Sequence, residues 1–420
     1  MTAVTAQRPR QPSRFMAIIS KAREANIVVL SVISLLIAGA FGAVLIILTT
    51  PSLLTSWESF FSHPGATIAS SAKLVWWAYE SLFQGAVVSF HDLSTWIGNP
   101  TKANLATVLG PLSSTLTYAS PLIVAGLGLS VGFRGSLFDI GGQGQVIAGA
   151  GAALIVGFSL HTSPLLQVPL EMVVAMLVGA LLAGACGALK AYTGAHEVIT
   201  TMMSSRIILA LLPWFLGLGF IARAGFHDGA SKTVNPEGQL PLLLGHISPS
   251  LTLNLGFPIA IATVFLVQWF FNRSKTGFRI FMVGQSREAA RTAGINIKQV
   301  TILTLALAGA LLGMAGMLEL TGIEQFMSTN FGGSYGIDAI AVALVGRNKP
   351  WGVFAAAVFF GMMQQGGQIM EATTGISQSL AIVIQAVVAF CIATPFFVCD
   401  IFKLRGGERL AALETSAGWA

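Results

Sequence analysis

Apolar stretches of about 20 residues recur along this 420-residue chain, and they constrain its fold more than any other feature. Only 10% of the residues are charged, whereas soluble domains carry roughly 25%. A helix that crosses a bilayer satisfies its backbone hydrogen bonds internally, which lipid cannot do for it. We therefore expect an all-α polytopic membrane protein with about ten transmembrane helices. Their expected positions are residues 27–48, 112–133, 137–160, 168–190, 196–220, 253–272, 300–321, 325–346, 351–371 and 378–400.

The distribution of basic residues predicts the orientation of these spans. An even number of spans places both termini on the same side of the membrane. Of the 23 lysines and arginines, 18 fall on that side and four on the other, while Arg206 lies within a span. Because cytoplasmic loops carry an excess of Lys and Arg, we expect both termini in the cytoplasm. The net charge of +6 therefore encodes topology, and no nucleic-acid partner is expected.

This topology predicts one large membrane domain with short tails. The predicted parts are a basic cytoplasmic N-terminus at 1–26, a single transmembrane domain at 27–400 with extracellular segments at 49–111 and 221–252, a cytoplasmic loop at 272–299, and a cytoplasmic C-terminus at 401–420.

Motifs for enzymatic chemistry are scarce in this sequence. No Gly-Lys pair occurs, so the chain has no P-loop for ATP. The three cysteines, Cys186, Cys391 and Cys399, lie in apolar segments without metal-ligand spacing. We expect no enzymatic activity, no metal and no cofactor in this chain. If ATP powers its activity, ATP and Mg²⁺ must be bound by a separate subunit.

Two glycine-rich, acid-bearing segments interrupt the expected spans, near 138–145 and 331–338. The first contains Asp139, Gln143 and Gln145, and the second contains Asp338. Such residues are costly in lipid but suit discontinuous helices whose backbone lines a central cavity. The alternative is that the glycines only permit tight packing and the acids lie at the water interface.

Polar residues at helical spacing form further candidate sites. Glu197 and Thr201 share one face of the fifth span, and Gln364 and Gln368 share one face of the ninth. Gln378 and Gln385 lie seven residues apart in the tenth. Amides both donate and accept hydrogen bonds, as recognition of a neutral polar solute requires. Hydrogen bonding between helices is the alternative role.

A short helix is predicted within the cytoplasmic loop. Ser286 is a suitable N-cap, Glu288 suits the first turn, and Gly294 suits the end of the helix. Such a helix either plugs into a partner protein or lies at the membrane surface. The residues that would make the contact are Arg287, Glu288, Ala289, Ala290, Arg291 and Gly294.

One short motif occurs twice. Gly179-Ala180-Leu181-Leu182 in the fourth span recurs as Gly309-Ala310-Leu311-Leu312 in the seventh. The two spans run in opposite directions in this topology, which an inverted repeat would explain. A chance match between helices rich in Gly, Ala and Leu explains it equally well.

Four longer motifs then carry a family resemblance. They are Gly135-Ser136-Leu137-Phe138-Asp139-Ile140-Gly141-Gly142-Gln143-Gly144-Gln145, Gly194-Ala195-His196-Glu197-Val198-Ile199-Thr200-Thr201-Met202-Met203, Ala289-Ala290-Arg291-Thr292-Ala293-Gly294-Ile295 and Gly336-Ile337-Asp338-Ala339-Ile340-Ala341-Val342-Ala343-Leu344-Val345-Gly346-Arg347-Asn348. With these motifs in order over roughly 110–400, the chain resembles the membrane permease of bacterial nucleoside ABC importers, in the branched-chain amino acid/ribose permease superfamily.

The resemblance implies an importer permease in the bacterial plasma membrane. Its implied partners are one or more ABC ATPase subunits that bind ATP and Mg²⁺, a second and paralogous permease subunit, an extracellular substrate-binding lipoprotein, and a nucleoside. The helix from Glu288 to Gly294 matches the loop that such permeases dock into the ATPase.

The sequence also departs from the family pattern. The family usually has Leu-Phe-Asn-Ile-Gly-Ala-Glu-Gly-Gln where this chain has Asp139, Gly142 and Gln143. The acid is displaced by four positions, which leaves a permease for ribose or another small polar solute as an alternative. An alternative of another class is an ion-coupled secondary transporter that uses the membrane acids.

Overall fold

The computed structural model describes residues 27–58, 60–61, 63–223 and 229–394, so the predicted tails at 1–26 and 401–420 lie outside the described residues. Within these ranges every regular element is a helix, apart from two isolated β-bridges in the 221–254 segment, which confirms the all-α class. The elements are α2 (Ile27–Thr49), α3 (Pro51–Glu58), α4 (Pro64–Ala86), α5 (Phe90–Gly98), α6 (Lys102–Arg134), α7 (Gly142–Ser159), α8 (Pro164–Thr193), α9 (Glu197–Leu216), α10 (Gly256–Arg273), α11 (Lys275–Gln285), α12 (Arg287–Thr292), α13 (Ile297–Glu319), the π-helical turn η1 (Leu320–Glu324), α14 (Tyr335–Val345), α15 (Pro350–Thr374) and α16 (Ser379–Ala393).

Four helices of the described chain are long and apolar enough to cross a membrane, namely α6, α8, α9 and α13 with η1. Shorter apolar helices occur within α2, α14 and α16. Each predicted span overlaps a helix, but the eighth does so only in its second half. There the chain is irregular from Gln325 to Ser334, and α14 has only 11 residues. Gly332 and Gly333 have φ values of +81° and +39°, which take the backbone out of a right-handed helix.

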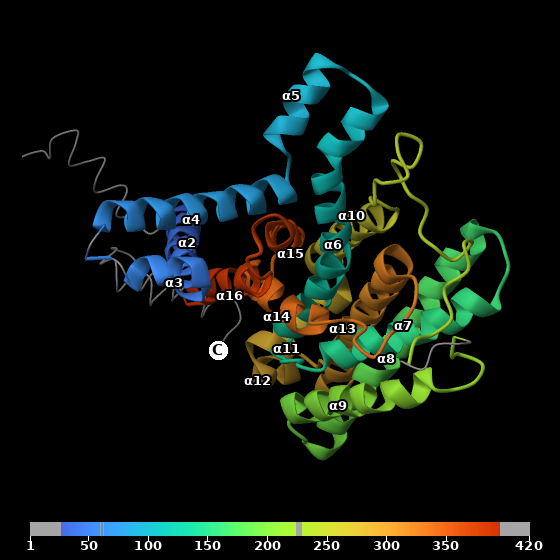
Figure 1. The fold of residues 1–420 in the computed structure, drawn as a ribbon. Helices are drawn as coiled ribbons and strands as arrows, with labels where there is room; N and C mark the ends of the chain where they lie inside the picture. The colour runs from blue at the N-terminus through green and yellow to red at the C-terminus, as the bar shows by residue number, and fades with distance from the viewer. Residues whose placement is uncertain (1–26, 59, 62, 224–228, 395–420) are drawn as a thin grey trace, which may run out of the picture.

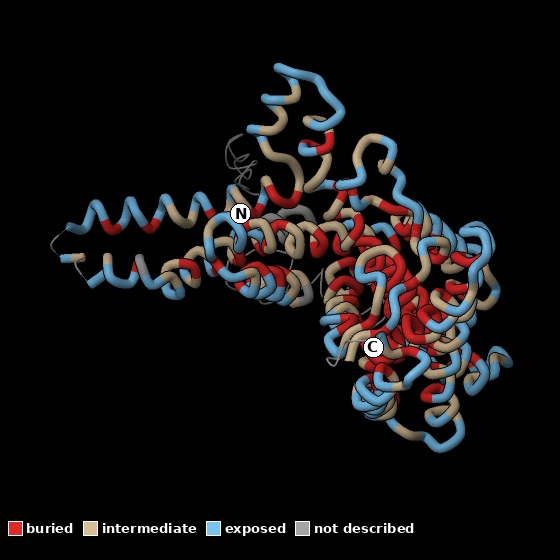
Figure 2. Tube along the Cα trace, turned by 45° about the vertical axis from the view of Figure 1, so that its right-hand side comes forward, coloured by how far each residue is buried: buried red, intermediate tan, exposed pale blue. Residues whose placement is uncertain are grey.

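The helices form a bundle with a separate N-terminal part. Figure 1 shows α2, α3 and α4 extending to one side of the bundle, and α5 and α12 at opposite ends of the molecule. The last turns of α4 pack on α15, and α2 packs on α16. Buried residues concentrate in the bundle, whereas the N-terminal arm is largely exposed (Figure 2). Trp76 and Trp77 lie on the exposed face of α4, which suits contact with lipid.

The interruption between α6 and α7 spans residues 135–141, and that before α14 spans 325–334. Each overlaps the first half of the segment predicted to be interrupted, 138–145 or 331–338, because α7 begins at Gly142 and α14 at Tyr335. The first turns of α7 and α14 meet, because Gly142 and Gly336 leave no side chain between them. An added Cβ on Gly142 would lie 3.1 Å from the carbonyl oxygen of Gly336, and one on Gly336 would overlap the amide nitrogen of Gln143.

The centre of the bundle is α13, which packs against α6, α7 and α8. Its contact with α8 is made backbone to backbone by the repeated motif. A Cβ on Gly179 would overlap the carbonyl oxygen of Gly309, and a Cβ on Gly309 would overlap that of Gly179. A Cβ on Gly313 would likewise overlap the carbonyl oxygen of Ala175. The two copies of the motif therefore contact each other reciprocally, in the close packing that small residues permit between membrane helices.

We call this contact of Gly179, Gly309 and Gly313 the seam. It predicts that alanine changes the stability of the protein in opposite directions at a glycine within the seam and at a helical glycine outside it. We expect Gly309→Ala to destabilise the protein by about 1–3 kcal/mol, because the new methyl group overlaps α8. Gly110→Ala, in α6, is the matched control. No atom lies within 4 Å of its added Cβ, and alanine favours a helix by roughly 0.5–1 kcal/mol. The measurement is the thermal unfolding midpoint in detergent. Equal midpoints for the two variants would contradict the seam.

Candidate functional site

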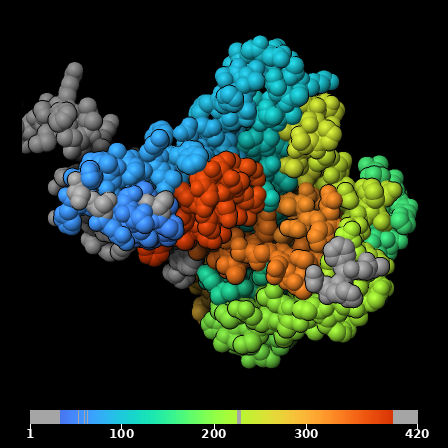
Figure 3. All heavy atoms as spheres, viewed as in Figure 1, coloured from blue at the N-terminus to red at the C-terminus, as the bar shows by residue number. Residues whose placement is uncertain are grey.

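A cavity of about 200 Å³ opens where α14 begins. Its walls come from α6, α14, α15 and α16 and from the irregular segment before α14. In Figure 3 the orange surface of that segment and α14 lies beside the red-orange surface of the last helices. The lining residues are Tyr118, Leu122, Gly333, Ser334, Tyr335, Asp338, Phe360, Gln364, Gln378, Ile382 and Gln385.

Sequence reasoning identified part of this lining. Asp338 and Gln364 are predicted site residues, whereas Gln368 is not among the lining residues. Tyr118 and Tyr335 were missed, although the chain has only four tyrosines and two of them line this cavity. The rarity of tyrosine in this chain could have indicated them, since they are neither acids nor amides.

The polar groups that line the cavity differ in whether they have hydrogen-bond partners within the described chain. Ser334 Oγ donates to Asp338 Oδ2 at 2.6 Å, which fixes one carboxylate oxygen. The Gln378 side chain donates to the Gln364 carbonyl oxygen at 3.4 Å. Gln385 is only 7% exposed, and its amide has no hydrogen-bond partner within the described chain. The cavity therefore holds a buried amide that is free to bind a solute or water.

Gln143, in the first turn of α7, holds the irregular segment that contributes Gly333 and Ser334 to the cavity wall, but it does not itself line the cavity. Its Nε2 donates to the carbonyl oxygens of Gly332 and Gly333 at 3.0 and 3.1 Å. Its Oε1 accepts from the N–H of Gly336 at 2.8 Å. One side chain thus satisfies backbone groups on both sides of the start of α14, where no helical partner exists. We call this set of three hydrogen bonds the Gln143 clip.

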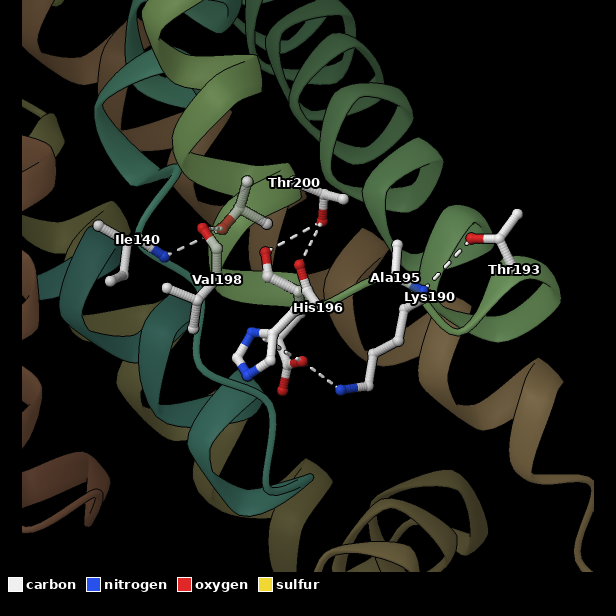
Figure 4. Close-up of polar contacts among 9 residues, drawn as sticks. Ile140, Lys190, Thr193, Ala195, His196, Val198 and Thr200 are labelled. Carbon is white, nitrogen blue, oxygen red and sulfur yellow. Dashed lines mark hydrogen bonds and ion pairs between the residues drawn. The ribbon is translucent and has the colours of Figure 1, made fainter.

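The start of α7 is itself satisfied from within the bundle. Asp139 is fully buried; its Oδ1 accepts from Gly141 N–H and its Oδ2 from Gln145 Nε2, both at 2.8 Å. In α9, Thr201 Oγ1 accepts from Ile140 N–H at 3.3 Å and Ser205 Oγ accepts from Gly144 N–H at 2.9 Å. Figure 4 shows the Ile140 amide turned toward α9. Asp139, Gln145 and Thr201 are therefore brought together, but they do not line the cavity.

Glu197 lies apart from that network, at the start of α9. It pairs with Lys190 of α8, and His196 Nδ1 lies 3.8 Å from the same Glu197 oxygen (Figure 4). The pair closes the turn between the two helices, in which Gly194 has a φ of +75°. This contact fixes the α8–α9 hairpin at the end of the molecule that the sequence predicts to be cytoplasmic.

The short helix predicted in the 272–299 loop is present as α12. Ser286 Oγ accepts from Ala289 N–H at 3.2 Å, Glu288 is in the first turn, and Gly294 has a φ of +75° just beyond the last turn. The six residues predicted to contact a partner divide between the two faces of the helix. Ala290 is fully buried against the bundle, while the exposed ones are Arg287, Glu288, Ala289, Arg291 and Gly294.

A second helix, α11, connects α12 to the interruption before α7. A Cβ on Gly284 would overlap the carbonyl oxygen of Arg134, and Ile280 lies against Gly135. The Arg134 guanidinium lies 3.9 Å from the centre of the Phe271 ring of α10, which further fixes this corner. The exposed helix is thus linked through α11 to the end of α6, from which residues 135–141 lead to the start of α7.

The sequence contains the Gly-x-Ser-x-Gly pattern typical of hydrolases twice, at residues 128–132 and 332–336. The first copy lies inside α6 and the second leads into α14, so neither follows a strand, as the turn that carries a nucleophilic serine does. Ser130 is fully buried and its hydroxyl donates to the Gly126 carbonyl oxygen at 2.8 Å. The first copy therefore serves helix packing, and the second serves the start of α14, where Ser334 donates to Asp338. No group of three His, Cys, Asp or Glu residues suited to a metal occurs in the described part of the chain.

Comparison with known proteins places this architecture in a family. The family model described as "Branched-chain amino acid transport system / permease component" matches residues 112–393. The chain is 30% identical over 337 residues to a nucleoside ABC transporter permease of Lactococcus lactis, covering 77% of this chain and 84% of the relative. It is 31% identical to a glucose ABC transporter permease of Haloferax volcanii, covering 71% and 81%.

A guanosine ABC transporter permease of Bacillus subtilis is 28% identical, covering 71% of this chain and 86% of the relative. Ribose import permeases are similar at 25% identity. No solved structure matches the chain. The family match covers well over half of the sequence and contains the cavity, the Gln143 clip and α12. This chain therefore belongs to the branched-chain amino acid transport system permease family, whose members are the membrane subunits of ABC transporters.

Proposed function

We propose that this chain is the permease subunit of an ABC importer for nucleosides. The observation that carries the proposal is the cavity at the start of α14, where free amides, one carboxylate and two tyrosines face a shared space. Those groups suit a neutral, polar solute that carries an aromatic ring. The names of similar permeases support the class of substrate, since four of them are nucleoside or guanosine permeases.

The proposed substrate path passes from this cavity through the junction of the two interrupted helices. Asp338 and Gln364 contact the solute first, and Gln368 lies one turn further along α15. The Gln143 clip then holds the start of α14 against α7. The remaining path residues of this proposal lie around the start of α7 and in the first turns of α9: Asp139, Gln145, Thr201 and Glu197.

In this proposal α12 is the contact with an ATPase in the cytoplasm. Five of its six candidate contact residues are exposed, and the buried Ala290 anchors the helix to the bundle. Movement of α12 would reach the start of α7 through α11, because Gly284 packs directly on the Arg134 carbonyl. ATP and Mg²⁺ would bind only to the ATPase, and this chain would need no cofactor.

The full importer would then contain this permease, a second and paralogous permease, the ATPase and an extracellular lipoprotein that delivers the nucleoside. It would lie in the bacterial plasma membrane with both termini of this chain in the cytoplasm. Of the 23 basic residues, the 18 that fall on the proposed inner side support that orientation.

Reconstitution into liposomes tests the proposed function. The complete importer is expected to accumulate radiolabelled nucleoside only with ATP on the ATPase side, whereas this chain alone accumulates none. Accumulation by the isolated chain under an ion gradient would instead establish the secondary transporter. Uptake of ribose or glucose in place of nucleosides would establish a sugar permease.

The contact at α12 makes a second prediction. Arg291→Glu reverses one of its exposed charges, and we expect nucleoside uptake to fall by at least tenfold, with less ATPase co-purifying with the permease. Lys73→Glu makes the same charge change on the exposed face of α4 and serves as the control. Normal uptake and normal assembly of Arg291→Glu would rule out this contact.

The Gln143 clip makes a third prediction. Gln143→Leu removes three hydrogen bonds and leaves the buried Gly336 N–H unpaired, which costs about 1–3 kcal/mol. We expect a lower thermal unfolding midpoint in detergent and faster passive loss of nucleoside from loaded liposomes without ATP. The exposed Gln299→Leu is the control, with both quantities unchanged. A Gln143→Leu protein that retains nucleoside and full stability would show that the clip does not close the path.

A further inference from the structure

The side chains that line the cavity beside α14 restrict the solutes it can bind more narrowly than membership of the family does. Its lining contains one carboxylate and no Lys, Arg or His among the described residues. A phosphate or carboxylate on the solute would meet Asp338 without a compensating cation, and like charges at close range repel. The cavity therefore favours neutral solutes over nucleotides and sugar phosphates.

The amide of Gln385 further restricts which solutes the cavity can bind. Only 7% of Gln385 is exposed, and its amide has no hydrogen-bond partner in the described chain. The amide atoms stay open to the cavity, so a ligand that presents a matching donor and acceptor can bind them in place of water. A glutamine amide offers both side by side, and glutamine pairs in this way with the edge of adenine in DNA.

The other walls complement a nucleoside at both of its ends. Tyr118, Tyr335 and Phe360 provide aromatic faces, on which bases stack in other nucleic-acid sites. Ser334 occupies Asp338 Oδ2, and no hydrogen bond within the described residues occupies Oδ1. That oxygen is free to accept from ribose hydroxyls. Gln364 and Gln385 come from α15 and α16, and Asp338 comes from α14, so the amides and the carboxylate are on different walls.

We propose that this permease itself recognises the base of an unphosphorylated nucleoside, through the Gln385 amide with Gln364 beside it, while Asp338 binds the ribose hydroxyls. The inference rests on the proposed import of nucleosides. It adds that base selection occurs within the membrane subunit and not only in the lipoprotein that delivers the solute. Gln385 is then a specificity-determining residue, and it lies in the last helix of the described chain.

The test measures ratios of import rates and not rates alone. The complete importer, with its own lipoprotein saturated, is given adenosine, guanosine, cytidine or uridine in separate experiments. We expect Gln385→Leu to change the ratios among the four by fivefold or more, because a bidentate contact to a base contributes about 1–3 kcal/mol of discrimination. Gln385→Glu keeps the acceptor but loses the donors, so its ratios should differ from those of both wild type and Gln385→Leu.

Asp338→Asn addresses the other end of the ligand. We expect it to leave the base ratios unchanged and to reduce the preference for ribonucleosides over 2′-deoxynucleosides. Gln268→Leu is the matched control, since Gln268 lies in α10 and is not among the residues that line the cavity. Both the base ratios and the ribose preference should remain at the wild-type values in that variant.

Each outcome bears on a distinct claim. If Gln385→Leu and Gln385→Glu slow all four nucleosides by the same factor, base recognition by this residue is overturned while nucleoside import stands. If the wild-type importer also carries nucleoside 5′-monophosphates at a comparable rate, the neutral-solute argument fails. If wild type carries no nucleoside at all, the proposed function fails together with this inference.

Discussion

Backbone groups at the start of a helix have no partners of their own, and inside a membrane no water supplies them. The structure begins two helices, α7 and α14, within the bundle, and their first turns meet. Gln143 satisfies three backbone groups around the start of α14, while Thr201 and Ser205 of α9 satisfy two at the start of α7. The cavity lies beside the second interruption, where the bundle itself satisfies the backbone groups, as lipid could not.

Close approach of the surrounding helices makes this arrangement possible. The seam of Gly179, Gly309 and Gly313 brings the backbones of α8 and α13 into contact, and α7 packs on both helices. With larger residues at the seam, α7 would be displaced from α14 and the side-chain caps would lose their geometry. The glycines therefore act on the site at a distance, through the position of α7.

Much of this architecture follows from the sequence. The recurrence of apolar stretches about 20 residues long predicts the helices. Glycines next to an acidic residue predict both interruptions, because few residues tolerate φ > 0 or a break in a helix at membrane depth. The cap, first turn and end of α12 follow from Ser286, Glu288 and Gly294. The eighth span was predicted too long because hydropathy records the apolar content of 325–346 but not the backbone turn at Gly332 and Gly333.

The site itself was predictable only in part. Asp338, Gln364, Gln378 and Gln385 are visible as polar residues at helical spacing, and all four line the cavity. The pairing of Asp139 with Gln145 was not visible, since it depends on how the chain bends at Gly141 before α7 begins. Tyr118 was missed because a single tyrosine in an apolar helix carries no periodic signal. Its role depends on which helices become its neighbours, and that is a property of tertiary packing.

The contact between Gly284 and the Arg134 carbonyl has a mechanical consequence. A long side chain between two moving parts acts as a spring, since its rotamers absorb small displacements before any force is passed on. Here one peptide unit rests directly against another, so a shift of α11 by a fraction of an ångström must displace the turn that leads into α7. This corner of the protein therefore behaves as a stiff linkage, in which a small displacement of α11 passes undiminished to the end of α6 and to the turn beyond it.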